Sequence, residues 1–128
     1  MQDFFGEPIH TYTRAEALED GVLVDVSQTA NEAGFVFPVA VTAGVWADVN
    51  DIPRSKQGIQ DVDGRLWDLL FLAALTCRRK SATGSQPDGL PFKLIMHVGR
   101  ATYYRAKVHL GPGDEMEPVI TIMQPNED

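Results

Sequence analysis

The chain has 128 residues, of which 44% are hydrophobic and 23% are charged, as is typical of a folded globular protein. A length of this order matches one domain, so we expect a single domain over residues 1–128. The formal net charge of −7 argues against a protein that coats DNA by general electrostatics, because such binding requires net positive charge.

Short elements are predicted at the start of the chain. Residues 9–12 have the composition of a strand. Thr13 and Glu16 form a capping-box pattern, which opens a short helix, and Gly21 is suited to end that helix. Residues 22–24 are again strand-like. We therefore expect a strand, a short helix and a second strand in this region.

The next segment mixes strand and helix signals. Residues 35–41 are rich in strand-forming side chains, but Pro38 predicts that they form an edge strand or an extended segment. Ser27 is expected to cap a short helix that runs through Glu32. Thr42 is expected to cap another helix.

One long helix is predicted at residues 64–79, after an exposed polar loop at residues 50–63. Asp63 is placed to cap this helix. Its apolar residues recur three and four positions apart and occupy most of its sides, which is typical of a helix covered on most sides. The side chains that we expect to be largely inaccessible are Trp67, Leu70, Phe71 and Ala74.

Three strands with alternating apolar and polar residues are predicted at 92–98, 103–110 and 119–123, and they are joined by short turns. We predict an α+β fold with a mixed N-terminal half of short helices, one long central apolar helix and a C-terminal three-stranded antiparallel meander.

The charges are unevenly distributed along the chain. Residues 1–64 carry a net charge of −8, residues 65–111 a net charge of +6, and residues 112–128 a net charge of −5. Such a chain is expected to fold with an acidic and a basic surface, and charge complementarity then governs the choice of partner.

Two observations bear on location. Cys77 is the one cysteine, so an intrachain disulfide is excluded and a reducing cytoplasm is indicated. The longest apolar stretch, at residues 69–75, is far shorter than the roughly 20 residues of a membrane-spanning helix. We expect a cytoplasmic protein without a membrane partner.

No catalytic, metal or cofactor motif is found. The histidines His10, His97 and His109 lack the spacing of metal ligands. His97 and His109 could face each other across a hairpin, although ordinary strand histidines are the favoured interpretation. Cys77 is expected to be buried and inert, and residues 111–114 form a hairpin turn rather than a phosphate loop.

Basic and aromatic residues share one face of the predicted meander. They are Lys93, His97, Tyr103, Arg105, Lys107 and His109. This combination suits single-stranded nucleic acid, because rings stack on bases and cations pair with phosphates. A solvated face, or a surface that meets the acidic half of the protein, would show the same pattern.

The acidic half supports the opposite hypothesis. Several of its carboxylates are ordinary residues of helix N-termini. Gathered on a rigid fold, however, they would imitate the spacing of phosphates and occupy a basic DNA-binding channel. The candidates for such a surface are Glu16, Glu19, Asp20, Asp25 and Glu32.

Several segments carry a resemblance to a known family. They include FFGEPI at 4–9, DGVLVDV at 20–26, PVAVT at 38–42, DGRLWD at 63–68, GPGD at 111–114 and EPVITIM at 117–123. Over nearly its whole length the chain resembles an uncharacterised bacterial family, a domain of unknown function, which is carried on plasmids, phages and other mobile elements. The resemblance implies a context near anti-restriction and anti-CRISPR genes, and it implies no activity, catalytic residue or cofactor.

Three functional hypotheses follow. The first is a mobile-element protein that inhibits a host defence complex, such as a CRISPR effector or a restriction system, by stoichiometric binding through its acidic surface. The second is a small nucleic-acid-binding protein that uses the basic strands. The third is an enzyme, since residues 9–13 resemble the first strand of ADP-ribosyltransferases, and Glu115 and Glu117 their late acid, although their intermediate tyrosine motif is not identifiable. The oligomeric state is not predicted.

Overall fold

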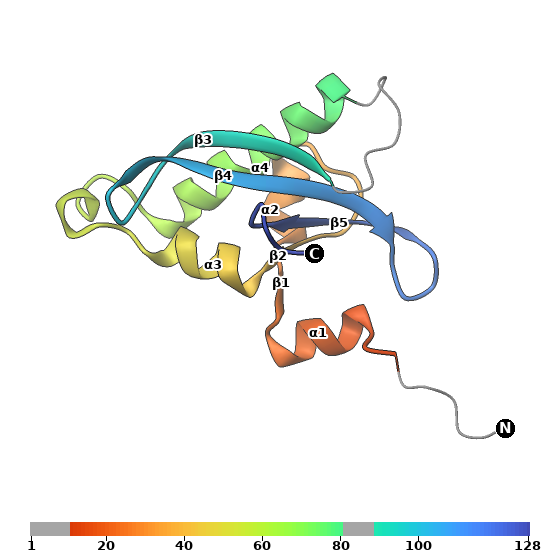
Figure 1. Cartoon of the computed structure of the whole chain (residues 1–128). Helices are drawn as coiled ribbons and strands as arrows, with labels where there is room; N and C mark the ends of the chain where they lie inside the picture. The colour runs from red at the N-terminus through yellow and green to blue at the C-terminus, as the bar shows by residue number, and fades with distance from the viewer. Residues whose placement is uncertain (1–10, 81–88) are drawn as a thin grey trace, which may run out of the picture.

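A five-stranded mixed sheet with helices packed on it forms the protein in this computed structural model, which describes residues 11–80 and 89–128 (Figure 1). The strands are β1 (Leu23–Asp25), β2 (Val39–Thr42), β3 (Leu90–Val98), β4 (Ala101–Pro112) and β5 (Pro118–Met123). Their order in the sheet is β1-β2-β5-β4-β3. Strands β2 and β5 run parallel, and the other neighbouring pairs run antiparallel.

Three helices cover one face of this sheet. They are α2 (Ser27–Glu32), α3 (Ala43–Asn50) and α4 (Val62–Lys80), with a 3₁₀ turn, η1 (Arg54–Lys56), in the loop before α4. The core lies between these helices and the sheet, and Val41, Val45, Leu69, Leu70 and Ile122 are fully buried there. The fourth helix, α1 (Arg14–Asp20), lies apart from the other three and beside β1 (Figure 1).

The three-stranded meander is wrong as a description of the sheet. Strands β3, β4 and β5 do pair in antiparallel fashion, but β5 also pairs with β2, and β2 with β1. The α+β class holds, whereas the sheet is larger and mixed. Alternation along the chain reveals a strand but not its partner, and the paired residues of β2 and β5, such as Val39 and Ile120, are 81 positions apart in the sequence.

Pro38 does not place its segment at the sheet edge. The strand begins one residue later, at Val39, and β2 lies between β1 and β5. The missing N–H of Pro38 therefore falls outside the ladder, while its carbonyl accepts a hydrogen bond from the Ile120 amide at 2.9 Å.

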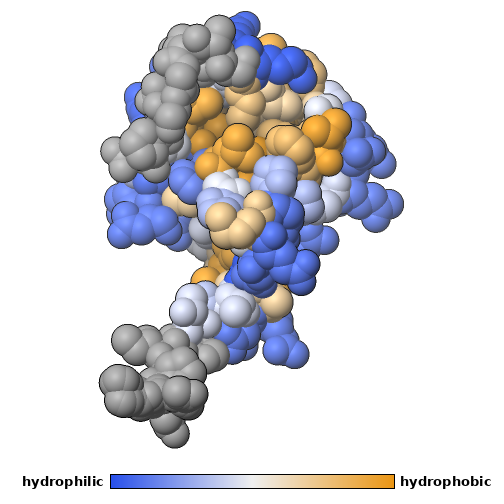
Figure 2. Space-filling view, turned by 90° about the vertical axis from the view of Figure 1, so that its right-hand side faces the viewer, coloured by the Kyte–Doolittle hydropathy of each residue, from blue (hydrophilic) through white to orange (hydrophobic). Residues whose placement is uncertain are grey.

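The connection from α2 to β2 leaves apolar side chains in solvent. Val36 is 83% exposed and Phe37 is 40% exposed. Figure 2, which views the molecule from the right-hand side of Figure 1, shows apolar side chains gathered in the upper part of that face, with hydrophilic side chains around them.

The prediction of burial along α4 is confirmed for Leu70 and Ala74 and wrong for Trp67 and Phe71. The last two side chains are 39% and 37% exposed, and their rings stack with centroids 5.1 Å apart. The sheet, α2 and α3 contact α4 along one side only. The side chains of Trp67 and Phe71 lie on the other side of the helix and consequently face solvent.

Two of the four predicted helix starts are corrected. Thr13 and Glu16 form the expected capping box, and Thr42 caps α3 by accepting a hydrogen bond from the Val45 amide. Ser27, however, is the first residue of α2 rather than its cap. Likewise Asp63 lies inside α4, and Asp61 accepts the hydrogen bond from the Gly64 amide at 2.7 Å.

Two further predictions concern single segments. Gly21 ends α1 in the left-handed conformation, with φ of 80°, as expected. Of the strand predicted at residues 9–12, Ile9 and His10 lie outside the described residues, and Thr11 and Tyr12 are not in a strand.

Candidate functional site

The face of the sheet opposite α2, α3 and α4 carries the basic residues. Leu94 and Ala106 belong to the core, and side chains alternate along a strand, so Lys93 and Arg105 point to the opposite, open face. These two residues are direct partners across β3 and β4. No helix of the α2–α4 layer covers them, and both are exposed.

An aromatic residue adjoins these cations. Tyr103 pairs with Ile95 across β3 and β4, and the two side chains are 53% and 64% exposed. The Lys93 Nζ lies 5.1 Å from the centre of the Tyr103 ring, within range of a cation–π interaction. The ring is thus held on the open face beside a cation.

The same face continues along β4 toward β5. Lys107 pairs with Met123, and His109 pairs with Thr121. Both basic side chains are half-buried. We call the five side chains Lys93, Tyr103, Arg105, Lys107 and His109 the basic strand face.

Every residue of the basic strand face is brought together by the sheet, whereas His97 does not extend it. His97 lies next to the β3–β4 turn at a register irregularity, far along the hairpin from His109. Its Nδ1 is buried without a hydrogen-bond partner in the described chain. The two histidines therefore do not face each other, and the geometry that a two-histidine site would need is absent between them.

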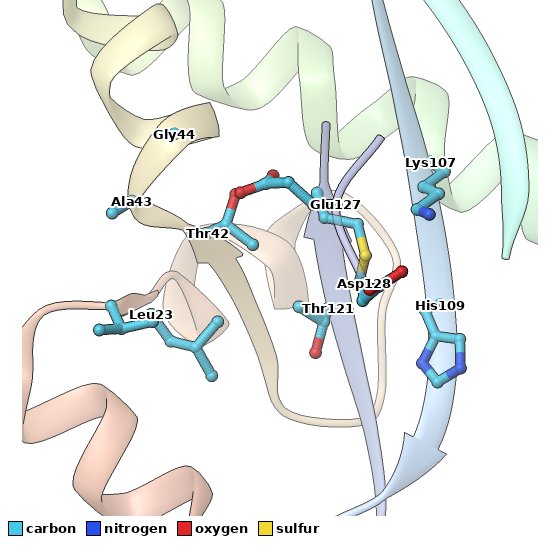
Figure 3. Close-up of a pocket in the computed structure, with 11 residues that line it drawn as sticks. Leu23, Thr42, Ala43, Gly44, Lys107, His109, Thr121, Glu127 and Asp128 are labelled. Atoms are coloured by element: carbon cyan, nitrogen blue, oxygen red, sulfur yellow. The ribbon is translucent and has the colours of Figure 1, made fainter. Parts of the chain in front are cut away.

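A pocket of about 690 Å³ lies at the β5 end of the basic strand face. Figure 3 shows Lys107 and His109 on β4 at one side and Leu23 and Thr42 across the pocket, with Thr121 between them. Residues Ala43 and Gly44 at the start of α3 also line it.

The segment after β5 forms one wall of this pocket. The Glu127 Oε1 accepts hydrogen bonds from the Thr42 hydroxyl at 2.8 Å and from the Gln124 amide at 2.6 Å. The Gln124 side chain donates to Asp48 Oδ2 at 2.8 Å and packs so close to Gly44 that a Cβ there would come within 3.0 Å. These contacts fix the wall to α3.

A buried tyrosine completes this attachment. The Tyr104 hydroxyl donates to Asp48 Oδ2 at 2.6 Å. Burial and the neighbouring Asp48 carboxylate raise the pKa of Tyr104, so the hydroxyl stays protonated and remains a donor. Asp48 thus joins α3, β4 and the segment after β5.

Sequence reasoning missed Thr121 and Glu127 as pocket residues. Thr121 stands between two core isoleucines of β5, and this alternation was a usable signal that it faces the open side. Glu127 follows the last strand and belongs to no motif. Only its hydrogen bond to Thr42, 85 positions earlier, places it at the pocket.

The acidic candidates Glu16, Glu19 and Asp20 all lie on α1. The helix is attached to the open face of the sheet, because Arg14 donates to the Thr121 hydroxyl at 2.7 Å and to the Ile120 carbonyl at 2.9 Å.

The first turn of α1 is also fixed by Asp114, which accepts hydrogen bonds from the backbone amides of Arg14 and Ala15. Burial lowers the pKa of Arg14, and the carboxylates of Asp114, Asp25 and Glu117 act in the opposite direction. Asp25 ends β1, the strand that α1 contacts. There it also accepts a hydrogen bond from the Ser27 hydroxyl at 2.6 Å.

Glu32 is separated from the other acidic candidates. It ends α2, which belongs to the helical layer on the opposite face of the sheet. The structure thus brings together the acids of α1 and Asp25, and it does not bring Glu32 to them.

The remaining candidate groups lie outside these sites. Cys77 is half-buried on α4, and burial raises the pKa of its thiol, which disfavours the reactive thiolate. Glu115 and Glu117 lie in the β4–β5 turn, where Glu117 accepts a hydrogen bond from the Glu115 amide, and neither lines the pocket. Within residues 11–80 and 89–128, no group of three or more potential ligands could hold a metal ion.

No helix in the described part of the chain is long and apolar enough to cross a membrane. The fold and the site together define a small α+β domain with an open, charged sheet face and a pocket at one end of that face.

The chain belongs to a family of unknown function (DUF6573), whose model matches residues 1–128. The expectation of an uncharacterised family is thereby confirmed over the whole chain. No curated protein and no solved structure matches the sequence.

Proposed function

We propose that this protein binds single-stranded nucleic acid on the basic strand face. The observation that carries the proposal is the alignment of Lys93, Arg105 and Lys107 on one open sheet face beside the exposed ring of Tyr103. An exposed sheet that combines aromatic rings with cations is a common platform for single strands, because bases stack on rings and phosphates pair with cations.

The spacing of the cations fits an extended ligand. Arg105, Lys107 and His109 follow each other at every second position of β4, so neighbouring members are about 6.8 Å apart along the strand. Cations in such a row can meet successive phosphates of one strand. Among the described residues, no carboxylate forms a salt bridge with any of the three.

The net charge of −7 is compatible with this proposal. Helix α1 contacts β1 and is attached to β5 through Arg14, whereas Lys93 and Arg105 lie on β3 and β4, the two strands at the other end of the sheet. Exposed charges separated by more than about 8–10 Å are largely screened at physiological salt. Binding therefore depends on the local charge of the basic strand face rather than on the net charge.

The binding test uses labelled mixed-sequence single-stranded RNA and DNA with fluorescence anisotropy over a range of salt. For Arg105→Ala/Lys107→Ala we expect the Kd at low salt to rise by at least about tenfold, because two phosphate contacts are lost. The slope of log K against log salt should become shallower by about 1.4, or about 0.7 for each contact.

The matched control is Arg54→Ala/Arg79→Ala, which removes the same charge from exposed positions on η1 and α4. It should leave the Kd within about twofold of the parent, since it touches no ligand. Equal weakening by both double variants, or no binding by the parent at low salt, contradicts the proposal.

A second candidate function is inhibition of a host defence complex through the acidic surface. We propose it because α1 is rigidly held: its capping box, the Asp114 contacts and the Arg14 hydrogen bonds fix it to the sheet. Acids on a rigid element are what a decoy for a basic DNA channel needs. In this proposal the protein acts in the bacterial cytoplasm, is carried by a mobile element, and binds a CRISPR effector or a restriction complex stoichiometrically.

The variant that tests the inhibitor is Glu19→Lys/Asp20→Lys. Glu16 is left unchanged because its carboxylate accepts a hydrogen bond from the Thr13 backbone amide in the capping box. Converting two acids to two bases should slow association with the defence complex sharply and abolish protection of an invading plasmid in cells. The readouts are the association rate and plasmid transformation efficiency.

Its control, Glu32→Lys/Asp68→Lys, makes the same charge change at exposed positions of the helical layer. Protection should be retained there. If the α1 variant protects as well as the parent, the acids of α1 are a solvated surface and the inhibitor proposal fails.

A further inference from the structure

We infer that the pocket at the end of the basic strand face binds one nucleotide, with its phosphate against Lys107 and His109 and the amino group of its base against Glu127. The inference deepens the proposed function and takes its class of ligand from it. It adds a base preference, which the open strand face alone would not supply.

The size and lining of the pocket suit a nucleotide. Its volume of about 690 Å³ falls within the range of small-molecule sites, about 300–1,000 Å³. Val22, Leu23 and Met123 supply apolar surface against which a base can pack. Thr42 and Thr121 add hydroxyls. An apolar lining with a few polar groups is typical of sites for small organic ligands.

The charged groups of the pocket stand on different walls. Lys107 and His109 come from β4, whereas Glu127 and Asp128 come from the segment after β5, and Glu127 is hydrogen-bonded to Thr42 at the start of α3 (Figure 3). The two carboxylates of the pocket, Glu127 and Asp128, disfavour a simple inorganic anion, because like charges repel. The arrangement favours a ligand that carries an anionic group at one end and hydrogen-bond donors at the other, as nucleotides do.

Glu127 keeps an oxygen available for such a donor. Its Oε1 accepts the hydrogen bonds from Thr42 and Gln124. Its Oε2 receives no hydrogen bond from the described residues. A carboxylate accepts from the exocyclic amino group of cytosine, whereas uracil presents a carbonyl oxygen at the same position. Cytidine and uridine monophosphates therefore form a matched pair of probes.

The position of the pocket also fits a bound strand. Lys107 lines the pocket and is two positions from Arg105, which lies outside it on the same face of β4. A strand that follows the row of cations thus reaches the pocket at one end. One nucleotide of that strand would occupy the pocket, and its neighbours would lie along β4.

The test is titration of the whole protein with each of four ligands: cytidine 5′-monophosphate, uridine 5′-monophosphate, cytidine and inorganic phosphate. Binding is measured by NMR chemical shifts and by calorimetry. We expect cytidine monophosphate to bind about tenfold more tightly than uridine monophosphate. Cytidine and phosphate alone should bind more weakly than the monophosphate, because each lacks one of the two contacts. The shifted resonances should include those of Lys107, His109 and Thr121.

Three variants separate the pocket from the rest of the face. Lys107→Ala should weaken the binding of cytidine monophosphate about tenfold, because a charge-assisted hydrogen bond to the phosphate is lost. Glu127→Gln keeps an oxygen for Thr42 and Gln124 but also offers an amide donor to uracil, so the preference for cytidine should disappear. Lys93→Ala is the control: it lies outside the pocket and should leave mononucleotide binding unchanged.

The outcomes distinguish the inference from the proposed function. Oligonucleotide binding without mononucleotide binding overturns the pocket and leaves the proposed function standing. Mononucleotide binding with the expected base preference, but no oligonucleotide binding, supports the pocket and contradicts the proposed function. Equal affinity for phosphate and both monophosphates shows an anion site only and overturns the inference.

Discussion

Leu70→Asp is expected to yield no cooperatively folded protein. Leu70 is fully buried between α4 and the sheet, among side chains of the core cluster. An unpaired carboxylate there costs several kcal/mol, which is comparable to the total stability of about 5–15 kcal/mol of a typical domain. Circular dichroism melting and the dispersion of a proton–nitrogen NMR spectrum measure the outcome.

The matched control is Phe71→Asp, at the next position on the same helix. This side chain is 37% exposed, so the new carboxylate stays hydrated. The variant should fold and lose only the stacking with Trp67, worth about 0.5–1.5 kcal/mol beyond area burial. The stability of Leu70→Ala should lie between those of the two aspartate variants, with a loss of about 2–5 kcal/mol in the free energy of unfolding. A Leu70→Asp protein that melts cooperatively near the parent would overturn the placement of α4 in the core.

Arg65→Ala is expected to lower the free energy of unfolding by about 3–5 kcal/mol, because it leaves several buried acceptors without donors. Arg65 is 4% exposed. Its guanidinium donates to the carbonyls of Asp48 and Val49 near the end of α3, to the His97 carbonyl of β3, and to the Gln60 side chain, at 2.8–3.1 Å. One side chain thus joins α3, α4, β3 and the loop before α4.

Burial lowers the pKa of Arg65, while the nearby Asp51 and Asp48 carboxylates oppose this shift. Arg65→Lys should recover only part of the stability, since a single ammonium lacks the planar fork that reaches three elements. Arg79→Ala, at an exposed position of the same helix, should change stability by less than about 0.5 kcal/mol. Urea denaturation measures all three variants, and equal effects of Arg65→Ala and Arg79→Ala would contradict this role.

The sequence predicted only part of the candidate site. The alternation of Tyr103, Arg105, Lys107 and His109 correctly indicated one strand face, because strand periodicity is a local property. The pocket could not be inferred, since its walls come from β1, α3, β4 and the segment after β5. These elements are far apart in sequence, and their contacts depend on strand pairing that no local pattern encodes.

In the helices, too, some features follow from the local sequence and others from tertiary packing. The capping box of α1 involves residues three positions apart, so the sequence determined it by itself. The exposure of Trp67 and Phe71 was decided by packing, because an apolar helix surface is buried only where another element reaches it.

By itself the sequence thus determined the α+β class, the caps of α1 and α3, and the outward alternation along β4, all of which depend on neighbours within a few residues. The tertiary structure decided the parallel pairing of β2 with β5, the attachment of α1 to the open face, and the meeting of Glu127 with Thr42. Those features depend on contacts between distant segments. Such contacts form only when the chain buries its apolar surface as a whole.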